Sequence, residues 1–251
     1  MKRLLIRADD LGFSEGTNYG IAKTVKEGII KSVGLMPNMP FSQHGFELIR
    51  DTGACIGQHT NICVGRPITD PKKIPSITQE NGEFKPSREY RNAEIDFVAL
   101  DEVVMEIEAQ YERFIEITGQ KPQYFEGHAV ASHNFFRGLE IVAKRHGLYY
   151  LEFSENGEPV PFGKGRLKMV MDSMDPGYIP FESLKRSLIP DQKDGILPMF
   201  VCHPGYLDAY ILEKSSLTIP RTKEVEMAVS EETKEFIRKN DIKIITYDDL
   251  K

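Results

Sequence analysis

"LLIRADDLGFSEG", residues 4–16, places an apolar run typical of a buried strand directly before two adjacent carboxylates, Asp9 and Asp10, and a glycine. Neighbouring like charges repel each other, so one of the two carboxyl groups is expected to be protonated or balanced by a positive charge. A bound cation would provide that balance. The stretch therefore predicts a first strand that ends in a site for a cation.

Apolar, β-branched runs recur along the chain and alternate with segments typical of amphipathic helices. The predicted strands are residues 2–8, 31–37, 54–62, 122–126, 148–153, 166–171, 196–202 and 242–247. Ser14 and Ser230 are predicted N-caps. One apolar face spans residues 100–118, and a further helix is expected from Asn134 to Gly147. The alternation predicts an α/β fold with a mostly parallel sheet, either closed as a barrel or open and doubly wound.

Residues 64–99 interrupt this alternation with weak periodicity, four prolines and a turn-like NGE at 81–83. A length of 251 residues with 40% hydrophobic residues suits one domain, residues 1–251, in which 64–99 is an insertion. A loop this long in a compact domain is usually functional or at an interface. We expect a lid or a subunit contact.

The net charge of −6 and the absence of a basic tract argue against nucleic acid or an anionic membrane as the partner. A small substrate that is neutral or weakly charged is favoured. The sequence shows no signal-peptide pattern and no apolar run of membrane length. These features predict a cytoplasmic protein.

The three cysteines, Cys55, Cys63 and Cys202, form no CxxC motif and cannot all pair, so a disulfide framework is not expected. A zinc site made of Cys55, His59 and Cys63 fails on geometry. On a strand, residues four apart lie roughly 13 Å apart, too far to share one ion. We interpret the cysteines as small core residues.

Polar residues gather where the predicted strands end. Asp9 and Asp10 end the first strand, His59 lies near the end of the third, His128 follows the fourth and His203 follows the seventh. In a parallel sheet these ends share one face, which would bring two carboxylates and three imidazoles to a common rim. Such a set suits a metal hydrolase.

Each of these signals also has a plainer interpretation. An acidic pair after a strand can open a turn or a helix, a lone histidine there can be structural, and HPG at 203–205 is typical of a turn. Their coincidence at four strand ends favours the shared site.

The motifs that carry these residues resemble those of the YdjC/ChbG-like carbohydrate deacetylases, in order and spacing, over nearly the whole chain. They are RADDLGFSEGTNYGI at 7–21, IGQHTNICVGRPI at 56–68, EAQYERFIEITGQKPQYFEGH at 108–128 and VCHPGY at 201–206. The resemblance implies a deformed β/α barrel, similar to a TIM barrel, that removes N-acetyl groups from amino sugars such as chito-oligosaccharides with one divalent metal ion. It also implies Asp10, His59 and His128 as metal ligands, Asp9 as general base, and a homodimer.

The chain departs from the family pattern in two places. Glu126 stands where an aspartate is typical, and Val130 stands at the second histidine of an H-x-H-x-H run, with His133 one residue out of step. No acidic residue shortly precedes the HPG turn, where the chain reads PMFVC. The three implied ligands are intact, so we expect the chemistry to be retained. Substrate preference and the groups that orient His203 stay open.

Three further residues have open roles. His203 can be cationic near neutral pH and is the expected acid that protonates the leaving amine, with orientation of Asp9 as the alternative. Arg66 could reach a sugar hydroxyl or a phosphate, or could be an ordinary exposed arginine. His133 could bind substrate or cap the helix near Asn134.

The identity of the metal and the reaction class also stay open. Two histidines and an aspartate suit zinc, but magnesium, manganese or cobalt can occupy such a site. Glu126 near His128 leaves room for a glycosidase or a phospho-sugar-cleaving hydrolase, which needs two carboxylates flanking the scissile bond. A sugar-binding protein without turnover is the third possibility.

Overall fold

β1 (Lys2–Leu11) is the central strand of one curved sheet in the computed structural model, which describes residues 2–154, 156–188 and 195–251. The other strands are β2 (Ser32–Leu35), β3 (Cys55–Thr60), β4 (Phe125–Gly127), β5 (Val160–Phe162), β6 (Gly165–Val170), β7 (Ile196–Cys202) and β8 (Ile242–Ile245). Their order is β4-β3-β2-β1-β7-β6-β5, with β8 paired to β1. All pairs are parallel except β5–β6.

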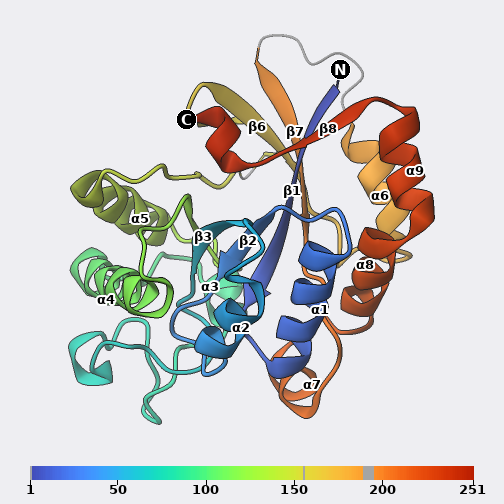
Figure 1. The fold of residues 1–251 in the computed structure, drawn as a ribbon. Helices are drawn as coiled ribbons and strands as arrows, with labels where there is room; N and C mark the ends of the chain where they lie inside the picture. Colours follow the sequence, from blue (N-terminus) through green and yellow to red (C-terminus); the bar gives the residue numbers. More distant parts are fainter. Residues whose placement is uncertain (1, 155, 189–194) are drawn as a thin grey trace.

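Helices surround the outside of this sheet (Figure 1). They are α1 (Glu15–Lys26), α2 (Ser42–Ile49), α3 (Ser87–Asn92), α4 (Leu100–Thr118), α5 (His133–His146), α6 (Pro180–Ser187), α7 (Ala209–Lys214), α8 (Ile219–Val229) and α9 (Glu231–Lys239), with 3-10 turns at Pro71–Lys73 and Tyr247–Leu250. The predicted α/β fold, a deformed barrel with mostly parallel strands, is confirmed. Because the strands run parallel, the carboxyl ends of β1, β3, β4 and β7 open toward one side of the molecule.

Ser14 and Ser230 cap α1 and α9, as the sequence predicts. The Ser14 hydroxyl accepts from the backbone N–H of Thr17, and α4 ends at Gly119 in the left-handed region, with φ of 71°. The start of α5 differs from the prediction by one residue. The structure caps this helix with Ser132, whose hydroxyl accepts from the N–H of Phe135, so Asn134 is already helical.

The predicted strand over residues 148–153 is wrong. Within this segment, Tyr150 makes one isolated bridge to Phe125 of β4, and the N–H of Leu148 still bonds to Ala143 at the end of α5. A short antiparallel hairpin, β5–β6, stands at the sheet edge instead. Its first strand contains Pro161, a residue found in strands mainly at edges, which is why the sequence does not indicate it.

The insertion at 64–99 folds onto the body of the protein. Its apolar residues Ile74, Ile77 and Phe84 are buried and share one core cluster with α4 and α5. The carboxylate of Glu106 in α4 accepts the backbone N–H groups of Ile68 and Thr69, which fixes the start of the insertion. The insertion is therefore a packed element whose far end can contribute to the pocket described below.

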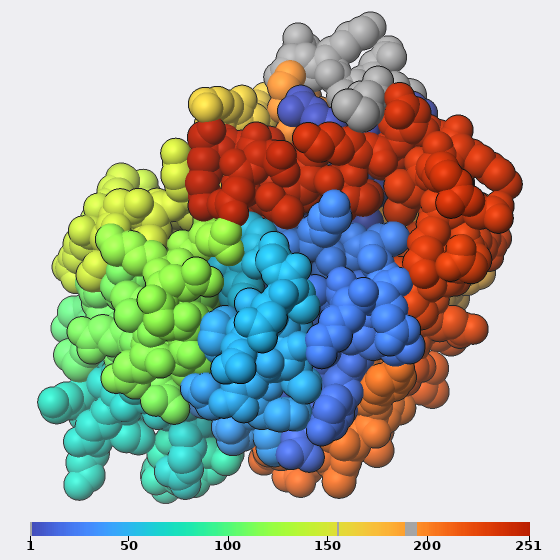
Figure 2. All heavy atoms as spheres, viewed as in Figure 1, coloured from blue at the N-terminus to red at the C-terminus, as the bar shows by residue number. Residues whose placement is uncertain are grey.

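In Figure 2 the N-terminal segment through α2 occupies the centre of the face, between α4–α5 and α8–α9, and the C-terminal part of the chain covers the upper side. The cysteines confirm the sequence interpretation, because Cys55, Cys63 and Cys202 are free and buried. Among the helices of the described ranges, none combines the length and apolar character needed to cross a membrane.

Candidate metal centre

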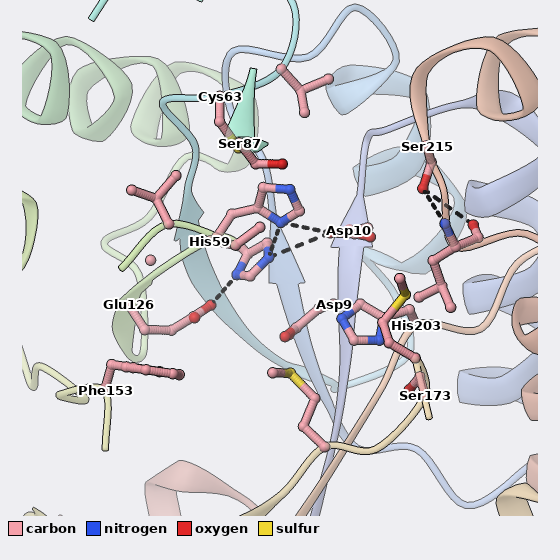
Figure 3. A pocket seen from close by; sticks show the side chains of 18 of the residues that line it. Asp9, Asp10, His59, Cys63, Ser87, Glu126, Phe153, Ser173, His203 and Ser215 are labelled. Atoms are coloured by element: carbon pink, nitrogen blue, oxygen red, sulfur yellow. Dashed lines mark hydrogen bonds and ion pairs between the residues drawn. The ribbon is translucent and has the colours of Figure 1, made fainter. Parts of the chain in front are cut away.

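Three side chains converge where β1, β3 and β4 end (Figure 3). The Nε2 atom of His59 lies 2.9 Å from Nδ1 of His128 and 3.4 Å from Oδ1 of Asp10, and the third side of this triangle, from His128 to Asp10, is 3.2 Å. The oxygen Asp10 Oδ1 is buried without a hydrogen-bond partner among the described residues. An ion with bonds of about 2.0–2.2 Å needs ligand atoms at such separations. The three residues therefore fit one divalent metal ion.

An irregularity in β1 explains how two adjacent aspartates serve one pocket. In a regular strand Asp9 and Asp10 would point to opposite faces. Here the pairing with β2 shifts register between Ala8 and Leu11, and Asp10 has a φ of 76°, in the left-handed region. Both side chains consequently line the same cavity.

Gly34 in β2 gives these side chains room. A Cβ atom at this position would lie 3.0 Å from Oδ1 of Asp9 and 3.0 Å from Cβ of His59. The neighbouring strand can approach the centre closely because it carries no side chain there.

A buried charged network holds His59 and Asp9. Because a carboxylate only accepts, the Nδ1–H of His59 donates to Glu126 at 2.5 Å, which leaves Nε2 facing Asp10 and His128. Arg7 binds Asp9 with two nitrogens, Nε at 2.6 Å from Oδ1 and Nη2 at 2.7 Å from Oδ2. Nη2 of Arg7 also lies 3.4 Å from Glu126, so one guanidinium orients both carboxylates.

Asp10 has its own cationic partner. The Nη2 group of the buried Arg221, in α8, donates to Oδ2 of Asp10 at 2.7 Å. This contact occupies one carboxylate oxygen and leaves Oδ1 for the triangle. Burial alone would raise the pKa of Asp10, but Arg221 and His128 hold it well below its usual range, so the carboxylate is ionised.

Protons compete with a metal ion for the two imidazoles of the triangle. Burial alone would lower the pKa of His59, but the carboxylates of Glu126 and Asp9 raise it to about 10. The carboxylate of Asp10 outweighs burial in the same way and raises the pKa of His128 to about 9. A metal ion binds neutral imidazole, so its binding would release protons from this pair.

His203, after β7, differs from the other two histidines. Burial lowers its pKa to about 4, despite the nearby carboxylates, and its Nδ1 atom has no hydrogen-bond partner among the described residues. The side chain lines the same pocket as Asp9 and Asp10 (Figure 3). Its ring is therefore neutral at pH 7.

The pocket has a volume of about 440 Å³ and a lining that mixes apolar and polar side chains. The apolar ones include Val130, Phe136, Phe153, Met169, Met171 and Met174. The polar ones include Ser87 and Arg91 from the insertion, together with Lys214, Ser215 and Ser216. Such a lining suits a small polar ligand with an apolar face.

The predicted residues fall into two groups by position. Asp9, Asp10, His59, His128 and His203 all line this pocket, as their places at the strand ends predict.

Two further residues lie outside its lining. The exposed Arg66 donates to the carbonyl of Asn81 within the insertion, and the exposed His133 begins α5 beside a small second pocket that contains Asp96.

Sequence reasoning missed Arg7 and Arg221, which line the pocket, and Glu224, which accepts the backbone N–H of His203 from outside that lining. Arg7 carries a usable signal, because residues two apart on a strand share a face and Arg7 precedes Asp9 by two. Arg221 and Glu224 share one face of α8 at a spacing of three, but no local pattern links that helix to β1.

The chain is similar to proteins of one family along its length. The family model described as "YdjC-like protein" matches residues 3–239. "Carbohydrate deacetylase 2" of Listeria innocua is 30% identical, over 99% of this chain and 98% of that protein.

Two solved structures share the fold. A crystal structure from Enterococcus faecalis, described as a candidate cellobiose-phosphate cleavage protein, has a TM-score of 0.85 at 24% identity and covers 99% of this chain and 98% of its own. A family 4 acetyl xylan esterase from Clostridium thermocellum, solved with a cobalt ion, has a TM-score of 0.52 at 13% identity, over 99% and 90% of the two chains.

Proposed function

The chain belongs to the YdjC-like protein family, and we propose on this basis that it is a metal-dependent N-deacetylase of short amino sugars such as chito-oligosaccharides. The relatives that support deacetylation of a carbohydrate match the chain almost from end to end. Dependence on a metal and the choice of an amino sugar are the parts that the experiment below tests.

One observation carries the proposal. Asp10, His59 and His128 direct three donor atoms at one point, while the neighbouring residue Asp9 lines the same pocket without belonging to that triangle. Hydrolysis of an amide at a metal centre needs one set of residues that binds the ion and a separate set that transfers protons.

A divalent cation held by Asp10, His59 and His128 would supply Lewis acidity, which lowers the pKa of water and polarises the acetyl carbonyl. Asp9 accepts the proton of the attacking water. Arg7 keeps both Asp9 oxygens in one orientation through its paired contacts. The carboxylate of Glu126 fixes the His59 ring, so that its Nε2 lone pair stays directed at the centre.

His203 completes the proton transfers. An amide nitrogen leaves as an amine only after it is protonated, and His203 is the remaining titratable group at the end of β7 that faces the pocket. Because burial lowers its pKa to about 4, His203 begins neutral, and the proton that Asp9 takes from the water has to pass to His203 before His203 can protonate the leaving amine. Orientation of Asp9 is the alternative role for this residue.

Glycoside cleavage fits the site less well. It requires two carboxyl groups on either side of the scissile bond, one of which is free to act as an acid. Glu126 is engaged by both His59 and Arg7, and Asp9 is paired with Arg7. Neither carboxyl group is a free acid.

The test loads the purified protein separately with zinc, magnesium, manganese and cobalt and supplies diacetylchitobiose. We expect near-stoichiometric metal with at least one ion, and release of acetate without new reducing ends. His59→Ala, prepared identically, should retain neither metal nor acetate release. New reducing ends without acetate would indicate the glycosidase class, and sugar binding without either product would indicate a protein without turnover.

Three finer statements stay predictions. Zinc is favoured by the two imidazole ligands, although magnesium, manganese and cobalt are tested beside it. A homodimer is implied by the family resemblance, and a cytoplasmic location is expected from the sequence. Sedimentation and fractionation of cells would test these two.

A further inference from the structure

The ring of His203 is not held by any polar side chain among the described residues. The imidazole of His59 is fixed by Glu126, and that of His128 by Asp10, whereas Nδ1 of His203 is buried without a partner. A ring that donates or accepts a proton during a reaction nevertheless has to lie within hydrogen-bond reach of its target. Its position therefore depends on packing and on the backbone that carries it.

Two side chains of α8 form hydrogen bonds with the backbone of His203, one with its N–H and one with its carbonyl. The backbone N–H of His203 donates to Oε2 of Glu224 at 2.7 Å, and its carbonyl accepts from Nη1 of Arg221 at 3.3 Å. Pro204 follows and restricts the backbone of His203 to extended conformations. Arg221 and Glu224 lie three residues apart, so both contacts come from one turn of the helix.

Glu224 is itself held rigidly by further donors. Its side chain is fully buried, and its Oε1 accepts from the hydroxyls of Ser173 and Tyr178 at 2.8 and 2.7 Å. These two residues belong to the segment between β6 and α6, which contributes Met171 and Met174 to the pocket wall. Glu224 thus joins the His203 backbone to the apolar part of the pocket lining.

All three groups that bind Glu224 act as donors toward it. An ionised carboxylate satisfies them, whereas the amide group of a glutamine would place a donor against at least one of them. Burial raises the pKa of Glu224 to about 7, against the effect of its hydrogen bonds, so the group is mostly ionised at pH 8.

We infer that Glu224 is a positioning residue, which sets the place of the His203 imidazole through the peptide N–H and links it to the pocket wall. Glu224 does not line the pocket, so it acts through His203 and not on the substrate. The inference rests on the proposed function in assigning His203 a part in proton transfer. It also answers what holds His203 in a chain that has no acidic residue shortly before the HPG turn.

The experiment combines Glu224→Gln with His203→Ala at pH 8, in the metal-loaded protein with diacetylchitobiose. Glu224→Gln alone should lower kcat by about 100-fold, the scale of a small misplacement of a catalytic group, with KM and metal content unchanged. Added to His203→Ala, it should lower kcat no further, because its effect passes through His203. Glu224→Asp, which keeps the charge but is one methylene shorter, is the second variant should the glutamine protein fail to fold.

The chain offers a matched control in Glu106. This residue is also fully buried and also accepts backbone N–H groups, but it lies outside the pocket lining. Glu106→Gln should therefore cost stability without changing kcat. Equal losses of kcat in the two glutamine variants, or a full further loss when Glu224→Gln is added to His203→Ala, would overturn the inference.

A readout without substrate separates this inference from the proposed function. The imidazole NMR signal of His203, assigned by its disappearance in His203→Ala, should shift in Glu224→Gln and stay in place in Glu106→Gln. An unmoved signal in Glu224→Gln overturns the inference. If the parent protein releases no acetate, the proposed function fails while the NMR signal still decides whether Glu224 positions His203.

Discussion

The three histidines around the pocket occupy two environments that differ in what holds the ring. His59 and His128 contact carboxylates directly through their ring nitrogens, and their pKa values rise to about 10 and 9. His203 is held by its backbone, its ring nitrogen Nδ1 has no partner among the residues described, and burial lowers its pKa to about 4. Residue type alone does not separate these environments.

The difference teaches how one pocket can assign separate tasks to the same side chain. Glu126 holds His59 through Nδ1, which keeps Nε2 directed at the centre, as a metal ligand requires. His128 meets Asp10 through Nδ1, the atom that would itself bind the ion. A ring fixed only through its peptide keeps both nitrogens available for protons, which is what an acid or base requires. Whether the ring or only the backbone of a histidine is held therefore decides whether it suits metal binding or proton transfer.

The largest effect is expected when one of the two metal-binding histidines is removed. His128→Ala should reduce retained metal from near-stoichiometric to none after loading and desalting, because it removes one of three protein ligands. His203→Ala should retain metal as the parent does. Elemental analysis of both variants after loading with zinc and with magnesium gives the measurement, and equal metal content in the two would remove the distinction between the histidines.

Asp9 is expected to act as the base without binding the metal ion. Asp9→Asn should keep its metal and lose about 10²- to 10⁴-fold in kcat, since an amide cannot accept the water proton. Release of acetate, measured beside metal content, tests this. Asp249→Asn, which changes a carboxylate at the C-terminal 3-10 turn, serves as the control and should behave as the parent. Metal loss in Asp9→Asn would make Asp9 a ligand.

Glu224, which holds the backbone of His203, should make the free energy of unfolding depend on pH. Burial raises the pKa of Glu224 from 4.5 to about 7, so between these values the unfolded chain ionises while the folded protein keeps its proton. Stability from this group is complete below about pH 4.5 and is lost as the pH rises through 7, by roughly 3 kcal/mol. Urea unfolding at several pH values should show this loss in the parent and not in Glu224→Gln. Parallel curves for the two proteins would contradict it.

The smallest effect is expected on metal affinity, when the carboxylate that orients His59 is changed. Glu126→Gln should weaken metal affinity about 10- to 100-fold, because the ring of His59 loses its ionised partner. Competition with a chelator measures the change. Glu108→Gln is the matched control, since Glu108 makes a similar contact with His146, at 2.6 Å, on the outside of the protein. An unchanged affinity in Glu126→Gln would mean that the carboxylate is not needed to orient His59.

The parts of the site that lie on strands could be predicted from the sequence. The apolar run before Asp9 and Asp10 and the strand patterns before His59 and His128 are local signals, and a parallel sheet brings such ends together without further information.

The parts that failed depend on contacts between distant segments. The strand predicted over 166–171 corresponds to β6, but β5 was missed because Pro161 weakens its strand pattern. Residues 148–153 have a strand composition but form only one isolated bridge, from Tyr150 to Phe125. Arg221 lies 211 residues from Asp10 along the chain, so no pattern of spacing could connect them. Glu224 likewise has no local signal, because its partner is a peptide N–H and every residue except proline offers one.

The irregular turn at Asp10 also sets which parts of the pocket can vary independently. Since Asp9 and Asp10 adjoin on the same strand, the proposed base and one proposed ligand are separated by a single peptide unit, about 3.8 Å between Cα atoms. Covalent geometry holds the Cα spacing fixed, and Arg7 and Arg221 hold the two carboxylates. Neither arginine belongs to the insertion or to the segment between β6 and α6, so these two segments can change, and with them the lining of the pocket, while the proposed base and ligand keep their places.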